Sequence, residues 1–102
     1  MRTVIEYIEF TAKAEKIFGR AETDELVSFL ADNPKAGREL EHFGGIRKLE
    51  WKEFGEHSVY FHPGAKKLPL VAIGVFRRGE KMILEKIMEI LIHGKIQGAA
   101  ER

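Results

Sequence analysis

Residues 43–51 read FGGIRKLEW, and this short stretch decides how the middle of the chain folds. The paired glycines suit a turn, and the apolar-rich segment that follows them suits a β-strand. The strand carries two adjacent cations, Arg47 and Lys48. Because side chains alternate across a strand, we expect Arg47 to share a face with Leu49 and Trp51, and Lys48 to lie on the opposite face. The stretch therefore offers one cation to each side of a sheet.

Three further segments have the composition of β-strands. Residues 3–9 (TVIEYIE) are rich in β-branched and aromatic residues, as are residues 57–62 and 70–76. The last two are separated by a segment that contains the strong turn signal Pro63-Gly64. Together with residues 46–52, the later strands are most simply arranged as successive antiparallel hairpins.

Helical spacing of apolar residues appears in three places. A first helix is expected from Phe10 to about Gly19, and a second is expected to be capped by Thr23 and to stop at Asn33-Pro34. A final amphipathic helix is predicted over residues 80–92. Residues 35–45 show no periodicity and read as a connection, and the tail 95–102 reads as frayed or dependent on a partner.

The resulting order is β-α-α-β-β-β-α within a single domain, residues 1–102. We predict an α+β fold in which the helices pack on one face of a mainly antiparallel sheet. The opposite face would then be free for a ligand.

Composition narrows the functional classes. The chain has 102 residues, is 44% hydrophobic and contains no cysteine, which excludes disulfides, thiolate metal ligands and a cysteine nucleophile. The net charge is +1, but residues 1–41 hold 6 Lys/Arg against 9 Asp/Glu, and residues 42–102 hold 11 against 7. This asymmetry favours a local anion-binding surface over a strongly basic nucleic-acid domain. No stretch approaches the length of a membrane span, so a soluble, cytoplasmic protein is expected.

Nearly the whole chain resembles the RelE/HigB superfamily of toxins from type II toxin–antitoxin modules, and especially its phage-associated, HigB-like branch. The most specific motif is FLADNPKAG (29–37) followed by GGIRKLEW (44–51), and SVYF (58–61) and LVAIGVFRRGEK (70–81) extend the match. The resemblance implies a RelE-like fold and a metal-independent mRNA endoribonuclease that acts mostly on the ribosome. It also implies that an antitoxin holds the protein inactive.

In that chemistry the ribose 2′-hydroxyl attacks the adjacent phosphate, and cations stabilise the developing charge. The resemblance makes Arg47 and Arg78 the expected phosphate-stabilising residues and His57 the candidate proton-transfer group. His57 stands where the family often has arginine, and Phe76 stands where it has tyrosine. The residues expected to bind RNA are Lys48, Tyr60, Phe76, Arg77 and Lys81. No metal or other cofactor is expected.

Other interpretations stay open. Arg47 and Lys48 could form ion pairs with Glu50 or Glu53 on a solvated face, and Trp51 could be core rather than a base-stacking platform. The chain could also be a catalytically weakened or inactive RelE-fold protein that binds protein or RNA, or a homodimeric structural subunit. The expected partners are a small helix-turn-helix antitoxin, mRNA and the ribosome, with operator DNA bound only through the antitoxin and no membrane.

Overall fold

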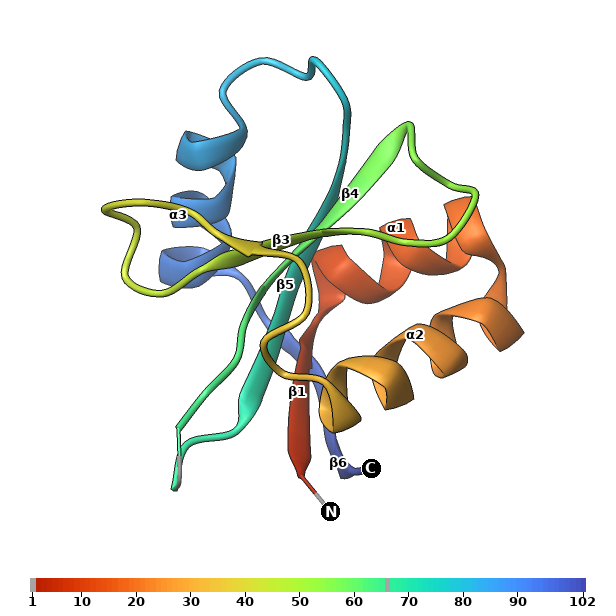
Figure 1. Cartoon of the computed structure of the whole chain (residues 1–102). Helices are drawn as coiled ribbons and strands as arrows, with labels where there is room; N and C mark the ends of the chain where they lie inside the picture. The colour runs from red at the N-terminus through yellow and green to blue at the C-terminus, as the bar shows by residue number, and fades with distance from the viewer. Residues whose placement is uncertain (1, 66) are drawn as a thin grey trace.

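A six-stranded sheet forms the centre of the computed structural model, which describes residues 2–65 and 67–102 (Figure 1). Its strands are β1 (Thr3–Tyr7), β2 (Arg38–Glu39), β3 (Arg47–Glu50), β4 (His57–His62), β5 (Leu70–Arg77) and β6 (Ile96–Glu101). The helices are α1 (Ile8–Phe18), α2 (Arg20–Asp32) and α3 (Ile83–His93). The strand order is β2-β3-β4-β5-β1-β6. The α+β class and the successive β3-β4-β5 hairpins are thus confirmed.

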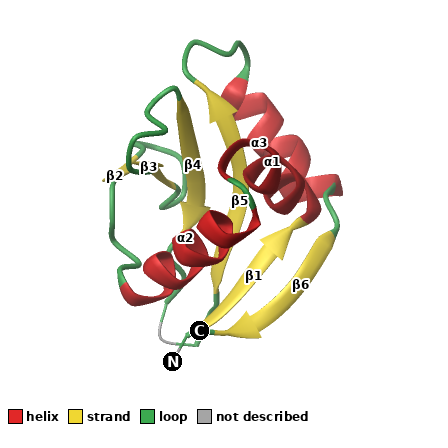
Figure 2. Cartoon of the chain, turned by 90° about the vertical axis from the view of Figure 1, so that its right-hand side faces the viewer, coloured by secondary structure: helices red, strands yellow, loops and turns green. Residues whose placement is uncertain are grey.

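The sheet is mixed, and it contains two strands that the sequence did not reveal. β1 pairs with β5 in parallel, and the other pairings are antiparallel. The prediction of a frayed tail is wrong, because residues of the tail form β6 beside β1 at the edge of the sheet (Figure 2). Arg2 and Arg102 exchange backbone hydrogen bonds of 3.0 and 2.9 Å. The tail satisfies the backbone groups that β1 would otherwise expose at an edge.

The helices cover both faces of the sheet, so the prediction that they share one face is wrong. α1 and α2 lie on one side of the sheet and α3 lies on the other (Figure 1). The cause is β5, which is apolar on both sides: Ala72 and Val75 pack with the first helical pair, whereas Ile73 and Phe76 pack with α3. A strand that is buried on both faces requires a covering layer on each. We call these faces the α1/α2 side and the α3 side.

A β-bulge in β5 sets the positions of two aromatic rings. Tyr60 is opposite Gly74 and Phe61 is opposite Ala72, so β5 holds one extra residue at this point. A Cβ on Gly74 would lie 2.9 Å from Cε2 of Phe76, because the Phe76 ring folds over the glycine. That ring packs edge-on against Tyr60, with 5.6 Å between ring centroids.

Helix boundaries differ from the predictions by a few residues. Thr23 does not cap α2, which begins at Arg20; its hydroxyl instead donates to the Gly19 carbonyl at 2.8 Å, inside the first turn. α3 begins at Ile83 rather than near residue 80, because the preceding residues form a turn that ends with Met82 in the left-handed conformation. No helix in the described part of the chain is long and apolar enough to span a membrane.

Candidate anion-binding site

Arg47 was the first candidate from the sequence to bind phosphate. Its guanidinium is instead hydrogen-bonded to backbone carbonyls of the protein. Its guanidinium donates to the carbonyl oxygens of Lys35 (2.8 Å), Ala36 (3.0 Å) and Gly37 (3.0 Å), and only 14% of its side chain is exposed. It lies on the α1/α2 side, the side predicted from alternation. Its acidic neighbour is Glu39, at 3.8 Å, and not Glu50 or Glu53. These hydrogen bonds of Arg47 therefore stabilise the turn that follows α2.

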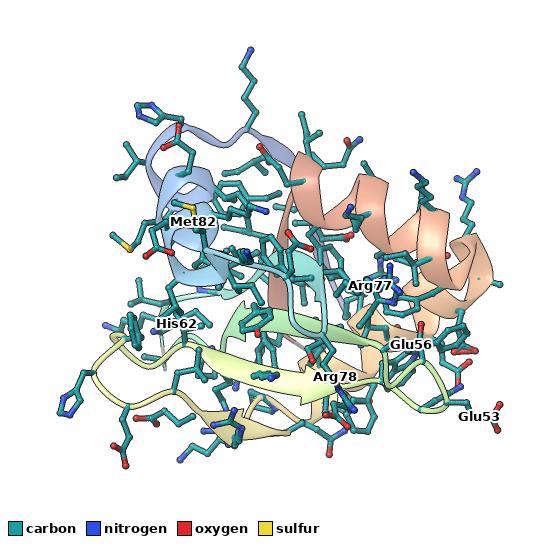
Figure 3. The ribbon with its side chains drawn as sticks, turned by 90° about the horizontal axis from the view of Figure 1, so that it is seen from above. Glu53, Glu56, His62, Arg77, Arg78 and Met82 are labelled. Carbon is teal, nitrogen blue, oxygen red and sulfur yellow. The ribbon has the colours of Figure 1, made fainter. Side chains whose placement is uncertain are left out.

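The predicted catalytic residues are not brought together on one face. His57 pairs with Arg77 across β4 and β5, on the α1/α2 side like Arg47, but it lies four residues along β4 from Phe61, which is the partner of Arg47. Arg78 follows the end of β5 and reaches the end of β3, whereas Arg77 points away from it (Figure 3). A shared phosphate site of Arg47, His57 and Arg78 does not fit these positions.

A row of polar side chains instead crosses the α3 side. Arg38 on β2 is directly opposite Lys48 on β3, and Lys48 is directly opposite Tyr60 on β4. Within residues 2–65 and 67–102, no carboxylate lies within 4.0 Å of either cation. Like charges placed directly opposite each other destabilise a sheet. An anion bound between Arg38 and Lys48 would remove this penalty. We call Arg38, Lys48 and Tyr60 together the cationic row.

No sequence pattern pointed to Arg38, because its strand has only two residues. The strand is positioned by Gly37, which has φ +72° and approaches the backbone of β3 so closely that a Cβ would collide with the Lys48 carbonyl. A shallow cavity of about 290 Å³ lies beside the row, lined by Gly37, Arg38, Lys48 and Glu50. Its size suits a small anionic group.

More cations flank the row at the end of β5. Arg78 contacts Glu50 at 3.5 Å and the Gly55 carbonyl at 3.2 Å, and 71% of its side chain is exposed. An exposed ion pair of this length contributes little to stability, so the guanidinium can exchange Glu50 for another anion. Lys81 is exposed in the turn that precedes α3, whereas Arg77 is exposed on the α1/α2 side of β5 and does not flank the row.

Tyr60 supplies a hydroxyl to the cationic row. The residue is only 4% exposed, and its ring is held by Phe76. Burial raises the pKa of the Tyr60 phenol above its usual value, Arg38 acts in the opposite direction, and Glu80 raises it further. The Tyr60 phenol therefore stays neutral, and able to donate a hydrogen bond, to a higher pH than an exposed tyrosine would.

The raised pKa of Tyr60 can be measured by alkaline titration. The chain contains two tyrosines, so the phenolate absorbance lost in Tyr60→Phe isolates one of them. We expect its midpoint above 10.0. Because the unfolded chain ionises first, the stability contributed by Tyr60 is complete below the unfolded pKa and is lost as the pH rises through the folded pKa. A midpoint at or below the unperturbed value would contradict this placement.

The other acid–base groups near the row already form hydrogen bonds within the protein. Glu80 accepts from Lys86 at 2.8 Å and from the Arg77 backbone at 3.3 Å; the Lys86 hydrogen bond is the main cause of its lowered pKa. His62 accepts from the Gly64 N–H at Nδ1, so its Nε2 donates to the Gly44 carbonyl. Arg38 and Lys48 can bind and polarise an anion, and Tyr60 lies directly opposite Lys48.

Comparison of this chain with protein-family models, curated proteins and solved structures gives no match.

Proposed function

We propose that this chain is a RelE/HigB-like toxin that binds RNA through the cationic row and cleaves it as a metal-independent endoribonuclease. The observation that carries the proposal is the directly opposed pair Arg38–Lys48 beside Tyr60, with no carboxylate of the described residues within 4.0 Å of either cation. The sequence resemblance supplies the class of substrate. A phosphodiester is the anion for which two convergent cations and a hydroxyl are suited.

Each group in the row has a distinct part in the proposed reaction. Arg38 and Lys48 stabilise the negative charge that builds on the phosphate when the 2′-hydroxyl gives its proton to water and its oxygen attacks phosphorus, and the 5′-oxygen leaves with a proton taken from water. Tyr60 donates a hydrogen bond to the same phosphate. Arg78 releases Glu50 and holds the neighbouring phosphate, and Lys81 extends the contact along the RNA backbone.

The biological setting follows from the resemblance. A cognate antitoxin, a small helix-turn-helix protein, would inhibit the toxin and would carry the operator binding of the module. mRNA on the ribosome would be the substrate, in the cytoplasm.

One observation favours a second function, RNA binding without cleavage. Arg47 donates its hydrogen bonds to backbone carbonyls, and His57 lies on the α1/α2 side, so two of the expected catalytic groups do not face the row. Tyr60 then has no free imidazole beside it to complete proton transfer. A RelE-fold protein with this arrangement would still bind RNA, but the rate of RNA cleavage would fall.

Induced expression separates the two functions. Growth arrest with new RNA 5′ ends by primer extension is expected of the toxin, and Lys48→Ala should abolish both effects. The exposed lysine variant Lys95→Ala is the matched control. RNA binding by the purified protein without new RNA ends would establish the second function. Absence of RNA binding by folded protein would contradict both.

A further inference from the structure

An exposed apolar stripe runs along the outer side of α3. Ile87 and Ile90 of this helix are buried against the sheet. Met88, Leu91 and Ile92 are apolar too, but between 37% and 65% of each is exposed. Because these three residues follow one another at helical spacing, they share one side of the helix. α3 therefore has a second apolar side, which stays in contact with water in the monomer.

Two other segments extend this stripe. Phe43, in the loop between β2 and β3, lines a groove of about 490 Å³ together with Met88 and Leu91 of α3. Ile96 is directly opposite Tyr7 across β1 and β6, and Tyr7 packs with the buried residues of α3, so Ile96 lies on the α3 side. Phe43 and Ile96 are both exposed. We call the resulting surface the α3 patch, which consists of Phe43, Met88, Leu91, Ile92 and Ile96.

The size of the α3 patch is that of one half of a small protein interface. Its five residues together expose roughly 450 Å², within the range of the largest apolar patch on a typical monomer, which is often functional. Two such patches, with the polar residues around them, reach the roughly 1,000 Å² at which a specific interface begins. The patch of one copy is therefore large enough to be covered by the same patch of a second copy.

The order of apolar residues along α3 fits a twofold axis. When two copies of the helix pack antiparallel about an axis at the level of Ile90, residues equally far from Ile90 face each other. Met88 of one copy then faces Ile92 of the other. Leu84, which is half-buried one turn before Met88, comes near Ile96, which follows the end of the helix. Each of these contacts is apolar on both sides and occurs twice in the dimer.

We propose that this chain forms a symmetric homodimer in which the α3 helices of two copies pack antiparallel through the α3 patch. Charge favours this orientation, because a parallel pair would bring the exposed Glu85 carboxylates of the two copies together. An antiparallel pair separates these carboxylates and also opposes the two helix dipoles. The dimer goes beyond the proposed function and does not depend on it, because the cationic row is not part of the patch.

Two charge substitutions at facing positions test the interface. Met88→Glu and Ile92→Lys each place a charge in the apolar contact, and both positions are exposed, so the monomer should stay folded. Analytical ultracentrifugation over a range of protein concentrations measures the dissociation constant, and thermal melting reports folding. The wild-type protein should sediment with the mass of two chains. Either substitution should raise the dissociation constant by roughly 100-fold or more, since it alters the interface twice.

An equimolar mixture of the two variants should restore the dimer. In a mixed dimer the introduced carboxylate faces the introduced ammonium at one contact, and the unchanged Met88 and Ile92 meet at the other. The control is Leu68→Glu, at an exposed apolar position between β4 and β5 and outside the patch, which should dimerise like the wild-type protein.

Three results would overturn the proposal. The first is a wild-type protein that stays monomeric at roughly 1 mM, which is also the result expected if a different protein covers the patch. The second is a mixture of folded variants that stays monomeric, because the facing positions would then be wrong. The third is an equal loss of dimer in Leu68→Glu, which would assign the association to exposed apolar side chains in general.

Discussion

Arg47→Ala is expected to lower the free energy of unfolding by about 3 kcal/mol, the loss typical of hydrogen bonds to a charged, partly buried donor. The substitution leaves the carbonyls of Lys35, Ala36 and Gly37 without their guanidinium donor. It also frees the turn that delivers Arg38 to the edge of β3. Urea denaturation at neutral pH measures the change as a shift in midpoint at constant slope.

Lys48→Ala is the matched control, because Lys48 is the next residue of β3, faces the other side and has no carboxylate within 4.0 Å among the described residues. Its free energy of unfolding should change by less than about 0.5 kcal/mol. Arg47→Lys should recover only a minor part of the loss, since an ammonium cannot reproduce the planar fork that reaches separate carbonyls. An unchanged midpoint for Arg47→Ala would mean that this guanidinium is free to bind a ligand, as the sequence first suggested.

Periodicity predicted the parts of the fold that local sequence controls. β4 covers residues 57–62, as expected, and alternation placed Arg47 and Lys48 on the correct faces of β3. Trp51 is 5% exposed, so its prediction as a core residue is confirmed. These features depend on side-chain spacing within one element, which a sequence displays directly.

The parts that the sequence did not predict depend on contacts between distant segments. β2 is two residues long and exists because Gly37 allows it to approach β3. β6 has no apolar alternation, because all its residues are exposed, and it is defined by pairing with β1 at the other end of the chain. The side of the sheet covered by α3 was likewise not encoded in the spacing of α3 itself.

The candidate site also contains residues whose placement follows from a single strand and residues whose placement depends on distant segments. Lys48 and Tyr60, both predicted to bind RNA, lie opposite each other, and Phe76 packs against Tyr60. Their faces followed from alternation within β3 and β4. Arg38 completes the row only through a tertiary pairing. The role of Arg47 could not be read from its position in the motif, since its partners are backbone carbonyls 10, 11 and 12 residues upstream.

The double variant Arg38→Ala/Lys48→Ala is expected to weaken binding of single-stranded RNA by roughly 10- to 100-fold at low salt, since two phosphate contacts are lost. The dependence of log affinity on log salt should also become shallower, by about 1.4 for two contacts at about 0.7 each. Anisotropy titrations over a range of salt concentrations measure both quantities. The two effects must occur together if the row binds phosphate.

Stability distinguishes this result from partial unfolding. Removing two like charges that face each other across β2 and β3 relieves repulsion, so the double variant should be as stable as the wild-type protein or slightly more stable. The control Arg20→Ala/Lys95→Ala removes the same charge from exposed positions away from the row and should reduce affinity only slightly. Equal losses in the two double variants would assign RNA binding to net charge alone. A selective loss, with unchanged stability and the shallower salt dependence, would assign it to the cationic row.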